Sequence, residues 1–251
     1  MRILQVCPRY RPHIGGVETV VEEVSRRLAA KGHEVTVVAT DPTRSLPRQE
    51  SLDGVSVVRF RSFAPGDAYY FAPGLRAFLR KASCDVVHAH GYHALPALAA
   101  TVSRAPRFVF TPHYHGKGHT PLRNLLLRPY RLAGDRIFAR ADAVTCVSAY
   151  EKGLVCRDFP QRCAKASVVP NGINKAEFAG LEPFPKKDKV LLYVGRLEEY
   201  KGVQYAIRAL PHLSGYTLVV IGRGPYRDEL RRLAAGLGLE GRVRFLEGLP
   251  P

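Results

Sequence analysis

The chain has 251 residues, 46% of them hydrophobic, which is enough for a sizeable core in one large domain or two smaller ones. No stretch approaches the roughly eighteen consecutive apolar residues of a membrane-spanning helix. The 38 basic against 22 acidic side chains give a formal net charge of +16, which predicts attraction to nucleic acid, anionic lipid headgroups or phosphorylated small molecules without choosing among them.

The start of the chain and its cysteines bear on the cellular compartment. The first strand-like run begins at Arg2, directly after Met1, which leaves no room for a signal peptide and predicts a cytoplasmic location. The five cysteines are odd in number and show no CxxC spacing, so reduced thiols are expected rather than a disulfide framework or a metal site. They are Cys7, Cys84, Cys146, Cys156 and Cys163.

In chain order, short β-rich runs alternate with helical patterns, which is typical of a parallel α/β sheet. A strand over residues 3–6 is followed by a helix over 17–31, whose apolar residues recur on one face and which stops at Gly32. About seven strands precede Asn171, enough for a complete Rossmann-like domain. The other expected strands cover residues 35–39, 55–60, 85–88, 108–111, 143–147 and 167–169.

A proline-containing segment divides the chain in this interpretation. Residues 1–182 form the first domain, 183–188 a linker, and 189–251 a second domain. After the linker, strands at Val190–Val194, Thr217–Ile221 and Val243–Leu246 alternate with helices over 203–213 and 226–237. Three strands and two helices make about half of a second Rossmann-like domain, so this domain is expected to be truncated.

Glycines 15 and 16 directly precede the first helix. Such glycines allow backbone N–H groups to approach an anion at the positive end of the helix, although a loop that needs positive φ is an equal alternative. A dinucleotide fingerprint fits poorly, because its glycines should follow the strand at once. Asp41, placed after the second strand as a ribose-binding acid would be, keeps that alternative open.

Histidines gather at the ends of two predicted strands. His88 and His90 follow one strand, and His113 and His115 follow another. Because ligands bind beyond the carboxyl ends of parallel strands, these side chains are expected to converge on one cleft and to orient a polar substrate or share a proton. A metal site is disfavoured, since no carboxylate or cysteine accompanies them at ligand spacing. A purely structural role for any one of them remains an alternative.

Basic side chains lie in a glycine-bracketed turn of the second domain. Arg196 follows the strand Val190–Val194 and Gly195, and Lys201 stands just before the next helix. A guanidinium and an ammonium at such a turn suit a diphosphate, and they can stabilise the charge of a departing phosphate without a metal ion. A second turn with Gly222 and Gly224 has the same form, but glycines in such turns are common.

Taken together, these segments resemble family 4 glycosyltransferases, and they occur in the family's order across nearly the whole chain. The resemblance implies a GT-B fold and transfer from a nucleotide diphosphate sugar with retention of configuration, without a metal or other cofactor. The matching segments are Gly15-Gly16, Thr111-Pro112-His113, residues 141–148, residues 168–174, residues 193–197, Lys201-Gly202 and residues 220–224.

The resemblance also implies roles for individual residues. Arg196 and Lys201 would hold the donor diphosphate, with Gly16 approaching it from the other domain, and His113 would approach the transferred sugar. These three side chains, His113, Arg196 and Lys201, are the catalytic candidates. Donor contacts are further expected at Gly15, Gly222 and Gly224, and the acceptor-side candidates are His88, His90 and Asn171.

One family feature is missing. The family carries a Glu-x7-Glu motif that contacts the donor sugar and ribose, and no two glutamates of this chain have that separation. The family pattern places them beyond Phe245, so very weak or no transferase activity is expected of this polypeptide. A non-catalytic or vestigial nucleotide-sugar-binding module is the main alternative.

The acceptor is expected to be a sugar or a lipid-linked compound. Residues 122–140 interleave basic and apolar side chains, with Pro129 expected to kink the helix or start a new one. This pattern suits peripheral contact with an anionic membrane at its inner face, although a packed helix with a solvated basic face is the alternative. The basic residues are Arg123, Arg128, Arg131, Arg136 and Arg140.

Two other classes remain as rivals. The net charge alone would suit a nucleic-acid-binding protein, but the basic residues are spread along the chain and no zinc-finger, RRM or basic-zipper pattern occurs, so no nucleic-acid partner is expected. If Asp41, after the second strand, bound a ribose, the sequence would instead indicate a dinucleotide oxidoreductase.

Overall fold

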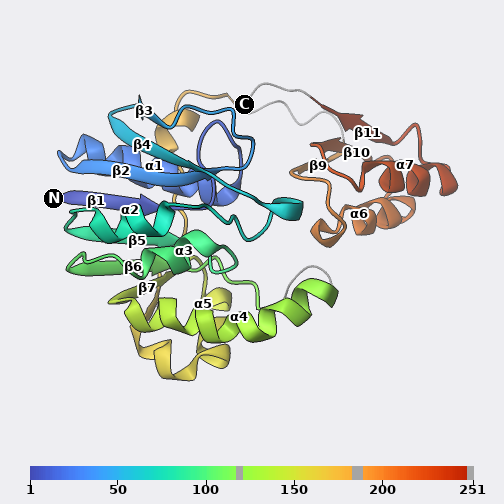
Figure 1. Cartoon of the computed structure of the whole chain (residues 1–251). Coiled ribbons are helices and arrows are strands. Elements are labelled where there is room, and N and C mark those ends of the chain that lie inside the picture. The colour runs from blue at the N-terminus through green and yellow to red at the C-terminus, as the bar shows by residue number, and fades with distance from the viewer. Residues whose placement is uncertain (117–120, 183–188, 248–251) are drawn as a thin grey trace. The chain divides into compact units, whose positions relative to one another are not determined.

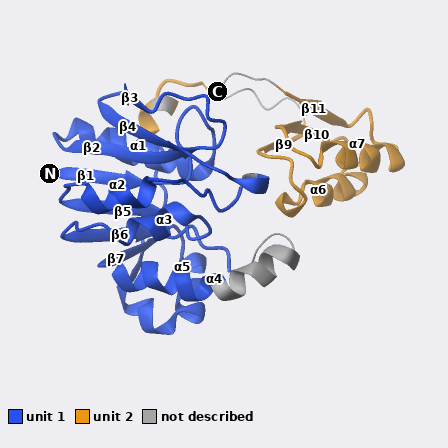
Figure 2. Cartoon of the chain, in the orientation of Figure 1, with its two compact units in different colours: residues 1–173 blue, residues 174–251 orange. Residues whose placement is uncertain are grey.

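The computed structural model describes residues 1–116, 121–182 and 189–247, without the side chains of 67, 121–129 and 177. The chain forms two compact units, Met1–Ile173 and Asn174–Pro251, which are described separately (Figure 2). This division falls before the domain boundary expected after residue 182, and the expected linker over 183–188 lies outside the described residues.

Unit 1 contains an eight-stranded sheet of order β3-β4-β2-β1-β5-β6-β7-β8 (Figure 1). All described pairings are parallel except that of β3 with β4. β1 lies in the middle and is almost wholly buried, as a strand covered on both faces must be. The strands are β1 (Arg2–Val6), β2 (Glu34–Asp41), β3 (Gln49–Leu52), β4 (Val55–Arg61), β5 (Val86–His90), β6 (Arg107–Thr111), β7 (Ala143–Cys146) and β8 (Ala166–Val168).

Helices cover both faces of this sheet. One core lies against α1 and includes Val21, Val37 and Val57, and the other includes Leu79, Phe108 and Phe138. Alternate residues of each strand enter opposite cores, which explains the double burial. The α-helices are α1 (Gly16–Ala30), α2 (Leu75–Lys81), α3 (Leu95–Ala100), α4 (Pro121–Arg140) and α5 (Ala149–Asp158), with 3₁₀ turns η1 (Pro65–Asp67) and η2 (Pro160–Lys165).

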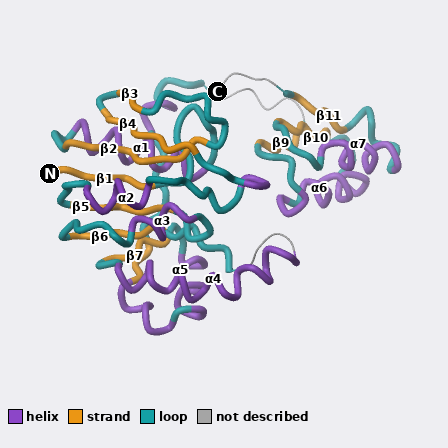
Figure 3. The backbone as a smooth tube through the Cα atoms, in the orientation of Figure 1, coloured by secondary structure: helices purple, strands orange, loops and turns teal. Residues whose placement is uncertain are grey.

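Unit 2 contains a parallel three-stranded sheet of order β11-β10-β9 (Figure 3). Its core includes Leu197, Ile207, Val220 and Leu230. The helix expected over 203–213 ends earlier as an α-helix and continues as a 3₁₀ turn where Pro211 enters. The elements are η3 (Lys175–Phe178), β9 (Val190–Val194), η4 (Glu199–Lys201), α6 (Val203–Ala209), η5 (Leu210–His212), β10 (Thr217–Ile221), α7 (Arg227–Gly236) and β11 (Val243–Leu246).

One expectation about unit 1 was wrong, and another was narrowed. Cys156 and Cys163 form a disulfide between α5 and η2, whereas reduced thiols were expected throughout. α4 continues through Pro129 as one helix, so no second helix starts there. The remaining cysteines, Cys7, Cys84 and Cys146, are buried and free. In the part of the chain that the structure describes, no helix is long and apolar enough to cross a membrane.

Candidate functional site

The carboxyl ends of β1, β5 and β6 lie side by side in the sheet of unit 1, because the three strands are neighbours and parallel. His88 and His90 belong to β5, and His113 lies two residues beyond β6. The rings of His88 and His90 are 4.1 Å apart, and those of His90 and His113 are 5.9 Å apart and stacked. The structure thus brings these three predicted residues together at one sheet edge.

His88 and His90 are each held by a polar side chain of a neighbouring strand. Nε2 of His88 lies 2.7 Å from Oγ1 of Thr111, which in turn lies 2.5 Å from Oγ1 of Thr145. Nε2 of His90 lies 2.8 Å from Oε1 of Gln5. Burial lowers the pKa of His88 to about 4 and that of His90 well below its ordinary value.

His113 has an unusual backbone and an unpaired ring nitrogen. Its φ of 47° lies in the left-handed region, which costs a residue with a Cβ about 1 kcal/mol or more. Its Nε2 is buried without a hydrogen-bond partner in the described structure. Burial, with help from the nearby His115, lowers the pKa of His113 to about 4. Just beyond the carboxyl end of β6, His113 therefore offers a neutral imidazole with one nitrogen that has no partner in the described parts of the chain and can bond a polar ligand.

The turn that carries His113 is fixed by Glu151, a residue that the sequence reasoning missed. The buried carboxylate of Glu151 accepts hydrogen bonds of 2.6 Å from the backbone N–H groups of Tyr114 and Val147. The hydroxyl of Tyr114 donates to Asp158 at 2.7 Å. A signal was present, since Ser148 and Glu151 have capping-box spacing, and Oγ of Ser148 accepts from the Glu151 N–H.

Gly15 and Gly16 begin α1 at the end of the long loop after β1. Gly15 has φ −176°, and Gly16 is not among the positive-φ glycines, so the alternative that they serve a positive-φ turn is wrong. A Cβ at position 15 would collide with the carboxylate of Glu18, whereas a Cβ at position 16 would meet no atom within 4 Å. Glu18 is buried and pairs with Arg9 at 3.0 Å. Open space therefore lies directly beside the first residue of α1.

In unit 2, Arg196 and Lys201 lie on the connection between β9 and α6. The side chain of Arg196 is 61% exposed and pairs with Glu198 at 2.8 Å. Lys201 is exposed, with its Nζ 5.2 Å from the centre of the Tyr200 ring. Both cations belong to one connection and remain accessible to an anionic ligand.

Glycines fix the backbone of this connection. Gly222, at φ 151°, packs so closely that a Cβ would overlap the carbonyl oxygen of Gly195. A Cβ on Gly224 would likewise overlap the carbonyl oxygen of Leu197. The Leu197 N–H donates to the Arg223 carbonyl at 2.9 Å. Close packing of the two loops therefore requires glycine here, whether or not a donor also contacts it.

Other predicted residues lie apart from the histidines or are already engaged. Asn171 is exposed beyond β8, two strands from β6. Asp41 is buried and accepts hydrogen bonds from Thr43 and Leu46 of its own loop, which opposes the ribose-binding alternative. No group of His, Cys, Asp and Glu residues in the described ranges could hold a metal ion.

The expected basic face of α4 is partly used within unit 1. Arg131 pairs with Asp158 at 3.2 Å, and Arg140 donates to the Ala105 carbonyl and lies 5.2 Å from the centre of the Phe108 ring. The side chains of Arg123 and Arg128 lie outside the described residues. Packing thus accounts for Arg131 and Arg140 without a membrane.

Comparison with known proteins decides the family. The model of Glycosyltransferase Family 4 matches residues 14–177, and that of Glycosyl transferases group 1 matches residues 174–251. The chain belongs to Glycosyltransferase Family 4. The two matches meet close to the boundary between the compact units.

Curated members of this family extend beyond the length of the chain. A glycogen synthase of Mycobacterium tuberculosis is 33% identical to this chain over an alignment 262 positions long. The alignment covers 92% of this chain and 63% of that protein. A phosphatidyl-myo-inositol mannosyltransferase of Mycolicibacterium smegmatis is 28% identical, over 98% of this chain and 64% of that protein. The chain spans less than two thirds of the length of these relatives.

Solved structures show the same fold. HepE of Anabaena in complex with UDP-glucose superposes with a TM-score of 0.72 and 20% identity, over 100% of this chain and 70% of that one. Sucrose-phosphate synthase of Thermosynechococcus elongatus gives a TM-score of 0.72 at 18% identity, over 99% and 70% of the chains. The expected GT-B fold class is confirmed.

Proposed function

We propose that this family 4 protein binds a nucleotide diphosphate sugar and transfers the sugar to an acceptor with retention of configuration and without a metal ion. The observation that carries the proposal is the pair of exposed cations, Arg196 and Lys201, on a connection whose backbone Gly222 and Gly224 fix. Fixed cations can offset negative charge that grows on a departing nucleotide, and such electrostatic stabilisation is commonly the largest contribution to catalysis.

His113 and its neighbours act on the sugar side in this proposal. A neutral imidazole with a free nitrogen can hydrogen-bond a sugar hydroxyl, and His88 lines the same edge for the acceptor. His90, also expected on the acceptor side, is fully buried and packs against the rings of His88 and His113 instead. Glu151 positions the His113 turn, and the open space at Gly16 admits an anion near the N-terminus of α1. Gly15 and Asn171 complete the proposed donor and acceptor contacts.

A sugar or lipid-linked compound is proposed as the acceptor. Among the relatives, one is a phosphatidyl-myo-inositol mannosyltransferase and another an alpha-monoglucosyldiacylglycerol synthase, so lipid acceptors occur in the family. UDP-glucose is the ligand of the HepE structure, which supports a nucleotide sugar as donor. Peripheral contact with an anionic cytoplasmic membrane face would bring the protein to such an acceptor.

We further propose that turnover by this polypeptide is very weak. The chain holds no pair of glutamates with the Glu-x7-Glu separation, the motif that the family resemblance assigns to contacts with the donor sugar and ribose. Donor binding without turnover, the non-catalytic alternative, is favoured by the same observation.

Calorimetric titration with UDP and GDP tests the donor site, and a transfer assay with their sugar conjugates tests turnover. In Arg196→Ala/Lys201→Ala, nucleotide affinity should fall at least about 100-fold, since each of the two charge-assisted contacts contributes about 1.5–3 kcal/mol. The control Arg208→Ala/Arg244→Ala removes the same charge from exposed positions of unit 2 and should bind within about twofold of the parent.

The outcomes separate the alternatives. Nucleotide binding that depends on Arg196 and Lys201 with weak turnover supports the proposal, and binding with no turnover favours the non-catalytic module. Equal losses in both double variants would show that only overall charge matters and would overturn the assignment of these residues. Rapid transfer would overturn the proposed weak turnover.

A further inference from the structure

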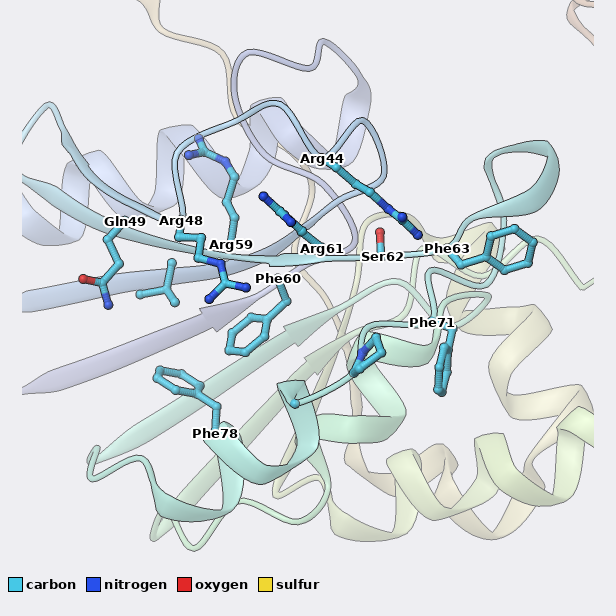
Figure 4. A pocket seen from close by; sticks show the side chains of 13 residues that line it. Arg44, Arg48, Gln49, Arg59, Phe60, Arg61, Ser62, Phe63, Phe71 and Phe78 are labelled. Atoms are coloured by element: carbon cyan, nitrogen blue, oxygen red, sulfur yellow. The ribbon is translucent and has the colours of Figure 1, made fainter.

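Unit 1 holds a pocket of about 740 Å³ that the proposed function does not use. It lies along the outer part of β4, between the connection from β2 to β3 and the start of α2 (Figure 4). Its lining combines arginines with phenylalanines and contains no acidic side chain. The lining residues on which the inference depends are Arg44, Arg48, Ser62, Phe63 and Phe71.

Two cations of the pocket lack a neutralising partner among the described residues. Figure 4 shows Arg44 extending from the loop between β2 and β3 to the vicinity of Ser62, and Arg48 lying farther along this loop, near Phe60. Both are exposed, and in the described structure neither guanidinium has a hydrogen bond or an ion pair. Arg59 differs, since it pairs with Glu50 and donates to the carbonyls of Arg11 and Pro47. Arg44 and Arg48 are thus free to bind an anion, whereas Arg59 supports the wall.

Aromatic side chains form the other half of the lining. The rings of Phe60 and Phe78 lie 5.4 Å apart, on β4 and α2. Phe63 and Phe71 are 62% and 59% exposed, and two reciprocal backbone hydrogen bonds of 2.8 and 2.9 Å hold their segments together. Two large exposed rings on fixed, paired backbone form an apolar patch that continues from the cationic part of the pocket.

A buried hydroxyl adds an independent indication of a ligand. Ser62 is 2% exposed and lines the pocket, yet its Oγ has no hydrogen-bond partner in the described structure. Leaving a buried polar group unsatisfied costs about 1–3 kcal/mol, so such groups are normally paired. A phosphate oxygen would satisfy this hydroxyl as well as the guanidinium groups.

We propose that this pocket binds a phosphorylated amphiphile, with its phosphate at Arg44 and Ser62, its charge further attracted by Arg48, and its hydrocarbon part against Phe63 and Phe71. Guanidinium groups match phosphate geometry, while exposed aromatic rings gain from covering an apolar chain. A ligand with only one of these parts would use half of the lining. The inference goes beyond the proposed function and stands without it, because binding here requires no donor and no transfer.

Single-stranded nucleic acid is the main competing ligand, because it also combines phosphates with groups that stack on aromatic rings. A strand tracks an extended groove with successive exposed rings, whereas this lining is a concave pocket whose Phe60 and Phe78 rings pack against each other. The amphiphile is therefore favoured, and an oligonucleotide serves as a test.

Calorimetry with decyl phosphate, kept below its micelle concentration, tests the proposal on the full chain. Decyl phosphate should bind at least tenfold more tightly than inorganic phosphate. Arg44→Ala/Arg48→Ala should weaken its binding at least tenfold, and Phe63→Ser/Phe71→Ser should reduce its affinity toward that of phosphate. The controls are Arg104→Ala/Arg107→Ala, which removes two exposed arginines at the other end of the strands, and Tyr150→Ser, which removes an exposed ring on α5. Both should bind within about twofold of the parent.

Two further measurements complete the test. Cosedimentation should be stronger with phosphatidylglycerol vesicles than with phosphatidylcholine vesicles, and Arg44→Ala/Arg48→Ala should reduce it whereas Arg104→Ala/Arg107→Ala should not. Absence of decyl phosphate binding, equal loss in the arginine variant and its control, or tighter binding of oligo(dT) that requires Arg44 and Arg48 would each overturn the proposal. Failure of nucleotide binding at Arg196 and Lys201 would leave it unaffected.

Discussion

The two units position their candidate groups in different ways. In unit 1, His90 is fully buried and bonded to Gln5, and the His113 turn is anchored through Tyr114. In unit 2, Arg196 extends into solvent. In this unit, close packing at Gly222 fixes the backbone of the β9–α6 connection but not the side chain of Arg196. The comparison teaches that groups needed as neutral hydrogen-bonding partners can be preorganised by burial, whereas cations stay hydrated and only their attachment points are fixed.

The largest effect is expected from a substitution at Gly222, which packs against the β9–α6 connection of unit 2. Gly222→Ala would place a Cβ against the carbonyl oxygen of Gly195 at a φ of 151°, so the two loops must separate. We expect unit 2 to lose about 3 kcal/mol or more of stability, measured by denaturant unfolding and hydrogen exchange of unit 2 amides. Gly236→Ala, in α7 with no atom near the added Cβ, is the control and should be neutral or slightly stabilising. Equal stability of both variants would contradict the steric role.

The next effect concerns the anchor of unit 1. Glu151→Ala leaves a buried and a partly buried backbone N–H group without an acceptor and should destabilise unit 1 by about 2–3 kcal/mol. Glu151→Gln retains one carbonyl oxygen and should recover part of this loss. Thermal unfolding measures both variants, and chemical shifts of His113 report its turn. An unchanged His113 environment in Glu151→Ala would remove Glu151 from the positioning role.

The third effect is the pH dependence of the histidines at the carboxyl ends of β5 and β6, which is spread over the whole range from pH 6.5 to 4. The pKa values of His88 and His113 fall from 6.5 to about 4, so between these values the unfolded chain binds protons that the folded chain excludes. Stability should therefore be fully present above pH 6.5 and decrease toward pH 4, by roughly 1.4 kcal/mol per pH unit for each histidine. The slope of unfolding free energy against pH measures this.

His88→Gln/His113→Asn provides the comparison for that slope. Asparagine tolerates the left-handed backbone at position 113, so the variant removes the imidazoles without adding strain there. Its stability should vary less between pH 6.5 and 4 than that of the parent. Equal slopes would show that these two histidines are not the groups that exclude protons.

The sequence predicted most of the sheet because most of its strands are short runs rich in apolar, β-branched residues. β3 was missed since Gln49–Leu52 has polar residues and no alternation, and only its antiparallel pairing with β4 makes it a strand. The gathering of His88, His90 and His113 followed from strand ends that share one edge. The Cys156–Cys163 bridge depends on how α5 meets η2, and the pocket beside β4 depends on a loop path, so neither is encoded in local periodicity.

The carboxylate of Glu18 has a consequence for how ligands enter at α1. It stands in the first turn of the helix, is buried, and is neutralised by Arg9. Its presence already compensates part of the positive helix end. We therefore expect the site at Gly16 to select among anionic ligands by their shape and hydrogen-bond geometry. Long-range electrostatic attraction of these ligands should come from the exposed basic side chains instead.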